Sequence, residues 1–220
     1  MALLPLLVFD LDGTLVDSLP DLTAALDRMM ARYDLAPFTE DEIRPMIGDG
    51  TAKLIVKAFA ARGSAPQPGD HETFVADYTA HVAVATRAYP HVDETLAALQ
   101  KDGWRFAICT NKSTSATKAV LNALGLTHWF PVLGCGDSFA AHKPDPAHLR
   151  GTIEMAGGAG DCAIMIGDHA NDIAVAVGIG CPGVFAEWGY GAPAMAKGAA
   201  AVAQRFADLP AIASRLRASI

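Results

Sequence analysis

Two aspartates near the start of the chain stand directly after an apolar run at residues 6–9. They are Asp10 and Asp12, in the segment Phe-Asp-Leu-Asp-Gly-Thr. A carboxylate can attack phosphorus and form an aspartyl-phosphate, and a second one nearby can protonate the leaving alcohol and then deprotonate water. Asp10 is therefore the candidate nucleophile and Asp12 the candidate acid/base. Gly13 would let the backbone approach a ligand closely, and Thr14 can orient a carboxylate by a hydrogen bond.

Carboxylates crowded into a small site repel each other and raise one pKa unless a cation lies between them. Mg²⁺ prefers oxygen ligands from a few carboxylates, waters and phosphate groups. We expect Asp10, the main-chain carbonyl of Asp12 and the more distant Asp168 to hold it. Asp172 stands one helical turn after Asp168 and can face the same ion, either as a direct ligand or through water.

Phosphoryl transfer also needs groups that hold the phosphate oxygens. Thr110 offers a hydroxyl, and Asn111 offers an amide at the expected start of a helix, whose amino end favours anions. Lys143 stands before Pro144 in a Lys-Pro-Asp-Pro segment. Its ammonium group is suited to neutralise both Asp10 and a bound phosphate.

The elements that must position these residues are predicted to be buried parallel strands. Apolar runs without alternation occur at residues 6–9, 106–109 and 163–166, and each ends abruptly in polar or glycine residues. Ligands of open parallel sheets bind beyond the carboxyl ends of the strands. Helical patterns alternate with the strands in the second half of the chain, and the pattern at residues 205–216 predicts a final helix. The expected fold is therefore an α/β, Rossmann-like, doubly wound parallel sheet, to which residues 132–133 and 184–185 can add strands.

Residues 17–88 show several consecutive helical patterns and no convincing strand. We expect them to form an α-helical cap domain inserted after the first strand, with residues 1–16 and 89–220 forming the catalytic core. Inserted there, the helices would cover the crevice and select substrates. Asp49 and Lys53 flank a glycine pair of this segment and are the candidate cap contacts to the leaving group.

Taken together, the motifs resemble the haloacid dehalogenase-like hydrolase superfamily. Its signature motifs match Asp-Leu-Asp-Gly-Thr at 10–14, Thr-Asn-Lys at 110–112, Lys-Pro-x-Pro at 143–146 and Gly-Asp-x₃-Asp at 167–172. The resemblance implies an Asp10 nucleophile, an Asp12 acid/base, phosphate binding by Thr110 and Lys143, and Mg²⁺ at Asp10, Asp12 and Asp168. The acidic residue at 12 favours phosphate esters over organic halides.

Within the superfamily, the helical insert, the Ile-Gly-Asp-Gly segment at 47–50 and the Tyr-Pro pair at 89–90 resemble the phosphoglycolate phosphatase branch. The branch implies 2-phosphoglycolate or a similar small phosphorylated metabolite as substrate. The chain departs from the branch at His91 and His169, where glycine and serine are usual.

The composition limits the partners. A formal net charge of −7 provides no basic surface for nucleic acid or for an anionic membrane. The apolar opening at residues 1–8 lacks the marks of a signal peptide, and the four widely spaced cysteines favour free thiols in a reducing cytoplasm. We expect a cytoplasmic enzyme acting on a small-molecule phosphate ester.

Two alternatives stay open. A sugar phosphomutase or other phosphotransferase would use the same motifs, although its cap usually presents an arginine after the glycine, where this chain has Asp49. A non-catalytic binding or regulatory protein on the same fold would be expected to lack Asp10, Asp12 or Lys143. The exact substrate and the oligomeric state do not follow from the sequence.

Overall fold

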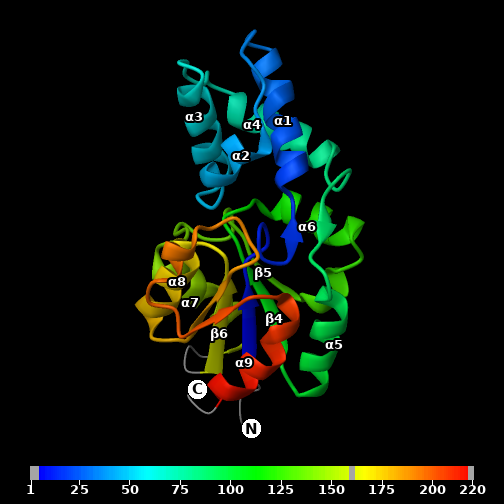
Figure 1. Ribbon diagram of the computed structural model, residues 1–220, viewed down its shortest axis with the longest axis vertical. Helices are drawn as coiled ribbons and strands as arrows, with labels where there is room; N and C mark the ends of the chain where they lie inside the picture. Colours follow the sequence, from blue (N-terminus) through cyan, green and yellow to red (C-terminus); the bar gives the residue numbers. More distant parts are fainter. Residues whose placement is uncertain (1–4, 159–161, 218–220) are drawn as a thin grey trace.

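The computed structural model describes residues 5–158 and 162–217 (Figure 1). Residues 1–4 of the apolar opening lie outside this part. Within the described residues, a parallel sheet has the strand order β5-β4-β1-β6-β7-β8. The strands are β1 (Leu6–Phe9), β4 (Arg105–Cys109), β5 (Val132–Gly134), β6 (Ala163–Gly167), β7 (Gly183–Ala186) and β8 (Ala201–Ala203). The predicted α/β parallel sheet is confirmed.

The central strand β1 is buried on both faces. Leu7 and Phe9 belong to one apolar cluster, which also contains residues of α5 (Val92–Lys101), α6 (Thr114–Ala123) and α9 (Leu209–Leu216). Leu6 and Val8 belong to a second cluster with α7 (Pro146–Met155) and α8 (Ala170–Ile179). Because helices cover both faces, successive strand residues are all apolar, which explains the unbroken hydrophobic runs.

Residues 17–88, which we call the helical unit, have an apolar core of their own. Their helices are α1 (Leu19–Ala31), α2 (Glu40–Ile43), α3 (Thr51–Ala61) and α4 (Asp70–Ala80). Leu26 and Met30 of α1 pack in one cluster with Phe59 of α3 and Phe74 of α4. Figure 1 shows the helical unit beyond the end of the sheet toward which β1 runs. The helices therefore stand over the edge where strand-end residues gather.

A two-stranded antiparallel ribbon joins the helical unit to the sheet. It consists of β2 (Val16–Asp17) and β3 (Arg87–Ala88), with Val16 opposite Ala88. The expectation that this segment contains no strand is wrong at its two ends. Strands of two residues are too short to produce the alternation by which a strand is recognised in a sequence.

Two details near the carboxyl terminus also differ from the expectation. Strand β8 lies in an Ala/Gly-rich stretch whose composition does not favour a strand. The final helix begins at Leu209, and the residues before it, Phe206–Asp208, form a 3₁₀ turn. Among the described residues, no helix is long and apolar enough to cross a membrane.

Candidate active site

The parallel sheet brings three strand ends together. Asp10 follows β1, Thr110 follows β4, and Asp168 follows β6, and β4 and β6 are the two neighbours of β1. The Asp10 amide donates to the Ile166 carbonyl (2.9 Å), which extends the pairing of β1 with β6 to the site. Neighbouring parallel strands end at one edge, so these side chains share a crevice as the sequence indicates.

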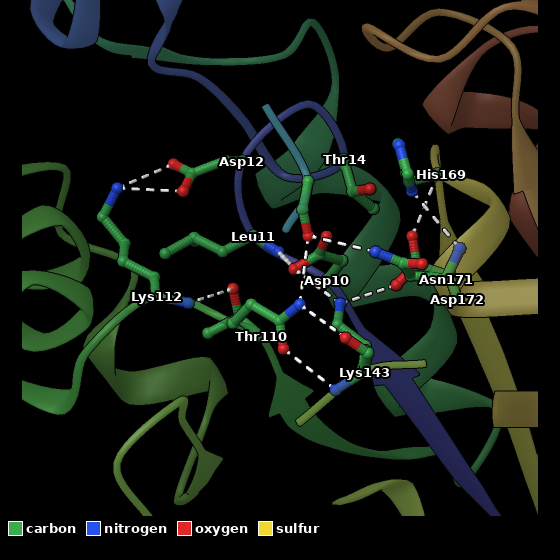
Figure 2. Close-up of polar contacts among 12 residues, drawn as sticks. Asp10, Leu11, Asp12, Thr14, Thr110, Lys112, Lys143, His169, Asn171 and Asp172 are labelled. Atoms are coloured by element: carbon green, nitrogen blue, oxygen red, sulfur yellow. Dashed lines mark hydrogen bonds and ion pairs between the residues drawn. The ribbon is translucent and has the colours of Figure 1, made fainter. Parts of the chain in front are cut away.

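Lys143 is the cation beside Asp10. Its Nζ lies 3.0 Å from Asp10 Oδ1 and 2.6 Å from Asp172 Oδ1, as Figure 2 shows. Its side chain is 1% exposed. Burial lowers the pKa of Lys143, but the charges of Asp10 and Asp172 outweigh burial and hold the pKa above its usual value. Lys143 therefore remains a charged group next to the candidate nucleophile.

Asn111, which follows the end of β4, holds the backbone of Lys143 in place. The Asn111 side chain accepts a hydrogen bond from the Lys143 amide (3.0 Å) and donates one to the Lys143 carbonyl (2.9 Å). It also donates to the carbonyl of Gly48 in the helical unit (3.0 Å). Its position at a helix start is not observed, because α6 begins at Thr114. Of the expected phosphate-binding residues that follow β4, Thr110 thus retains a hydroxyl at the site, whereas the Asn111 side-chain amide already has partners.

Asp10, Asp168 and Asp172 form a buried acidic triad. One carboxylate oxygen of each lies within 4.8 Å of the others. Burial, and then the charges of Asp10 and Asp172, raise the pKa of Asp168 to about 8. A single lysine, Lys143, contacts this triad through ion pairs within the described part of the chain. Three buried carboxylates and one ammonium group leave an excess of negative charge, so the donor set fits a divalent cation that prefers oxygen ligands.

Thr14 and Gly13 shape the position of Asp168. The Thr14 hydroxyl donates to Asp168 Oδ1 (3.1 Å), and the amide of Tyr190 donates to Asp168 Oδ2 (2.7 Å). Gly13 has a φ of +82°, and a Cβ atom there would overlap the Asp168 carboxylate. Gly13 is therefore required by the close approach of a carboxylate to the backbone.

Asp12 points away from Asp10 and Asp172, toward a second buried lysine, Lys112 (Figure 2). The Nζ of Lys112 lies 3.0 and 2.9 Å from the two Asp12 oxygens and 2.9 Å from the Tyr78 hydroxyl. The Ser18 hydroxyl also donates to Asp12 (2.6 Å). Sequence reasoning gave Lys112 no role of its own, although its place directly after Thr110 and Asn111 is a signal that it lies at the strand end.

Asp172 is completely buried and takes part in helix capping as well as charge pairing. Its carboxylate accepts from the His169 amide (3.0 Å) in addition to the ion pair with Lys143. Burial raises the pKa of Asp172 to about 6. Metal binding by Asp172, either directly or through water, stays a prediction.

A small cavity lies between the strand ends and the helical unit. The core contributes its polar wall: Asp10, Asp12, Thr110, Asn111 and Lys112. The helical unit contributes its other wall: Leu22, Ile47, Gly48, Gly50, Thr51 and Leu54. The polar groups on its core side and the apolar side chains on its other side are the kinds of group that line small-molecule sites.

The two candidate cap contacts lie beside this cavity and do not line it. Asp49 accepts hydrogen bonds from Asn171 of α8 (3.0 Å) and from Lys57 (2.7 Å). Lys53 is 4.0 Å from Asp49, and its side chain is 65% exposed. In this structure Asp49 thus joins the helical unit to the core, and Lys53 faces solvent.

Comparisons with known proteins agree with this geometry. The model of the family described as haloacid dehalogenase-like hydrolase matches residues 7–186. The phosphoglycolate phosphatase of Agrobacterium fabrum is 42% identical over 190 residues, which cover 84% of this chain and 82% of that protein. The phosphoglycolate phosphatase of Rhodospirillum rubrum is 40% identical and covers 92% of this chain and 88% of its own length. A crystal structure described as a predicted phosphoglycolate phosphatase from Haemophilus somnus has a TM-score of 0.87 at 30% identity, covering 97% of this chain and 99% of that one.

The fold and the site define an α/β enzyme with a buried carboxylate and a buried lysine side by side at the carboxyl edge of a parallel sheet. The chain belongs to the haloacid dehalogenase-like hydrolase family. Within this family it is a phosphatase, as the motif resemblance indicates.

Proposed function

We propose that the chain hydrolyses small phosphate monoesters with Mg²⁺ as cofactor, and that 2-phosphoglycolate is its favoured substrate. The observation that carries the proposal is the ion pair between Lys143 Nζ and Asp10 Oδ1, at 3.0 Å, next to a cavity that Asp10 lines. A carboxylate in this position can attack a phosphorus atom whose negative oxygens are neutralised by the same lysine.

In the first step Asp10 forms an O–P bond, and the bond between phosphorus and the ester oxygen breaks. Asp12 gives a proton to the departing alkoxide, which leaves as an alcohol. In the second step water attacks the aspartyl-phosphate, Asp12 takes a proton from that water, and Asp10 returns to its carboxylate form as inorganic phosphate leaves. Thr110 donates its hydroxyl to a phosphate oxygen, and the Asn111 backbone amide offers a further donor.

Asp10 and Asp168, together with the Asp12 main-chain carbonyl, would hold the magnesium ion. When bound, the ion would neutralise charge on the phosphate and on the clustered carboxylates. This assignment is supported by the excess of buried carboxylates over ammonium groups at the acidic triad. The Thr14 and Tyr190 hydrogen bonds would keep Asp168 turned toward its ligand position.

The helical unit would act as the cap domain, with the catalytic core formed by residues 1–16 and 89–220. Its Leu22, Ile47 and Leu54 border the cavity opposite Asp10. Apolar side chains there would exclude bulk water while the phosphoryl group is transferred. The choice of 2-phosphoglycolate is supported by the small cavity and by relatives of that name at about 40% identity.

The test compares Asp10→Asn with the wild-type chain by phosphate release from 2-phosphoglycolate in the presence of Mg²⁺. We expect loss of more than ~10³-fold in kcat, because the nucleophile is removed. Asp41→Asn is the matched control, since Asp41 is exposed on α2. Wild-type turnover by Asp10→Asn would rule out the nucleophile. Incubation with a hexose 1-phosphate separates the mutase alternative, because a mutase yields the isomer and a phosphatase yields free phosphate.

A further inference from the structure

A second pocket opens from the main cavity on the side of the acidic triad. Asp12, Ile47 and Gly48 line both spaces. The pocket is otherwise bordered by Arg44, Pro45, Asp168, His169, Tyr190, Gly191 and Met195. Asp12 therefore stands where the two spaces meet.

Arg44 brings a positive charge to this junction that no carboxylate balances. The two lysines near the nucleophile already have carboxylate partners. Lys143 pairs with Asp10 and Asp172, and Lys112 pairs with Asp12. Over residues 5–158 and 162–217, Arg44 forms no ion pair. A partly buried arginine without an anionic partner, placed at the wall of a pocket, is a suitable site for a ligand anion.

The aromatic ring of Tyr190 holds Arg44 in place. The guanidinium carbon of Arg44 lies over this ring, 5.7 Å from its centroid. The ring itself is fixed, since the Tyr190 hydroxyl donates to Asp17 (2.8 Å) and accepts from the Ser18 amide (2.7 Å). This cation–π contact gives the guanidinium group no anionic partner, so its N–H groups remain available to a ligand.

We propose that Arg44 binds a carboxylate on the leaving group of the substrate, so that it selects phosphate esters of hydroxy acids. The inference rests on the proposed function, in which Asp12 protonates the ester oxygen. In a phosphorylated 2-hydroxy acid, one carbon separates that oxygen from the carboxylate. When the ester oxygen lies next to Asp12, the carboxylate therefore lies in one of the two spaces that Asp12 lines. Arg44 is the cation without an ion-pair partner at these spaces.

The experiment compares two esters of similar length, 2-phosphoglycolate and 2-hydroxyethyl phosphate, whose leaving groups differ mainly by the carboxylate. We measure kcat/KM for both with the wild-type chain, Arg44→Met and Arg44→Lys. Arg44→Met is expected to lose roughly 10- to 100-fold on 2-phosphoglycolate and to stay within about twofold on 2-hydroxyethyl phosphate. Arg44→Lys is expected to lie between, because it keeps the charge without the planar pair of donors. Arg32→Met, at an exposed arginine after α1, serves as control.

The outcomes separate this inference from the proposed function. Equal losses on both esters would assign Arg44 a structural role through Tyr190 and overturn the inference. A wild-type preference for 2-phosphoglycolate that persists in Arg44→Met would also overturn it, and would leave the proposed substrate intact. A wild-type chain that cleaves both esters equally well would remove the glycolate assignment and the carboxylate site together.

Discussion

The Nζ atom of Lys112 lies between Asp12 and Tyr78, 2.9 Å from Asp12 Oδ2 and 2.9 Å from the Tyr78 hydroxyl. The lysine belongs to the core, and Tyr78 belongs to α4 of the helical unit. Burial lowers the pKa of Lys112, but the Asp12 charge, the Tyr78 hydroxyl and the hydrogen bonds to both together outweigh burial, and the pKa is raised. The candidate acid/base is therefore held by a charged group that also contacts the helices above the site.

A double-mutant cycle tests this pair. Lys112→Met leaves the Asp12 carboxylate without its cation, and we expect a loss of about 3 kcal/mol in the free energy of unfolding. Lys112→Met combined with Asp12→Asn should recover at least ~1 kcal/mol of that loss, because no uncompensated charge remains. Urea unfolding measures both. Lys118→Met, on the exposed face of α6, is the control. Additive effects of the two substitutions would contradict the coupling.

Asp49 and Lys53 are expected to differ in their effect on catalysis. Asp49 is bonded to Asn171 of the core at 3.0 Å, whereas Lys53 is largely exposed. Asp49→Ala should lower kcat/KM by roughly 10-fold on every ester tested, because it loosens the contact between the helical unit and the core. Lys53→Ala should change it less than about twofold. If the loss in Asp49→Ala varied with the leaving group, Asp49 would be a substrate contact after all.

The stability of the connection between α1 and β3 should depend on pH through Asp21. Its carboxylate accepts from the Ala85 amide, the Thr86 amide and the Thr86 hydroxyl. Burial raises the pKa of Asp21, but these hydrogen bonds outweigh it and the pKa is lowered. The stabilisation is thus present above the unfolded pKa of about 4 and is lost as the pH falls through the folded value.

Asp21→Asn provides the comparison for that pH dependence. At neutral pH we expect the variant to be less stable by about 1–3 kcal/mol, because the amide is a weaker acceptor. Between pH ~5 and ~3 the wild-type chain should lose more stability than the variant, and unfolding curves at each pH would show the two converging. Parallel curves over this interval would exclude Asp21 as the titrating group.

His91 occupies a position that glycine would fill with less strain. Its φ is +66°, in the left-handed region, at the start of α5. A non-glycine residue in this conformation costs about 1–2 kcal/mol of stability. Glycine would remove this strain, but it loses more conformational entropy on folding, which offsets part of the gain. His91→Gly should therefore raise the free energy of unfolding by up to about 1 kcal/mol. His91→Ala, which keeps the strain, should show no such gain in thermal or urea unfolding.

The sequence predicts those site residues that directly follow a buried strand. Asp10, Thr110 and Asp168 follow apolar runs, and parallel pairing alone brings them together. The helical unit is equally visible, because the α1 positions around Leu26 and Met30 repeat with a helical period. Short elements such as β2 and β8 leave no such pattern, so the sequence does not predict them.

Contacts between distant segments account for the rest. Lys112 reaches Asp12 and Tyr78, which are far from it in sequence, so no local pattern marks the pairing. Asn111 and Asp49 likewise have polar partners across the boundary between core and helical unit. Such contacts depend on how the core and the helical unit pack against each other. The spacing of residues within either part does not reveal this packing.

Removal of the metal should inactivate the enzyme without unfolding it. The acidic triad carries excess negative charge, so we expect a divalent cation to bind there and chelation to abolish phosphate release. Added Mg²⁺ should restore activity, whereas Ca²⁺, which prefers more ligands and longer distances, should restore much less. Full activity in excess chelator would contradict the assignment of the triad.

Acid quenching can trap the aspartyl-phosphate that the proposed mechanism forms on Asp10. Asp12→Asn lacks the base for the second step, and 4-nitrophenyl phosphate needs little protonation of its leaving group, so a radiolabelled sample should accumulate phosphoenzyme. We predict close to one hydroxylamine-sensitive label per chain, on the peptide that contains Asp10, and none in Asp10→Asn combined with Asp12→Asn. A label on another residue, or turnover with no labelled chain at any time, would contradict phosphorylation of Asp10.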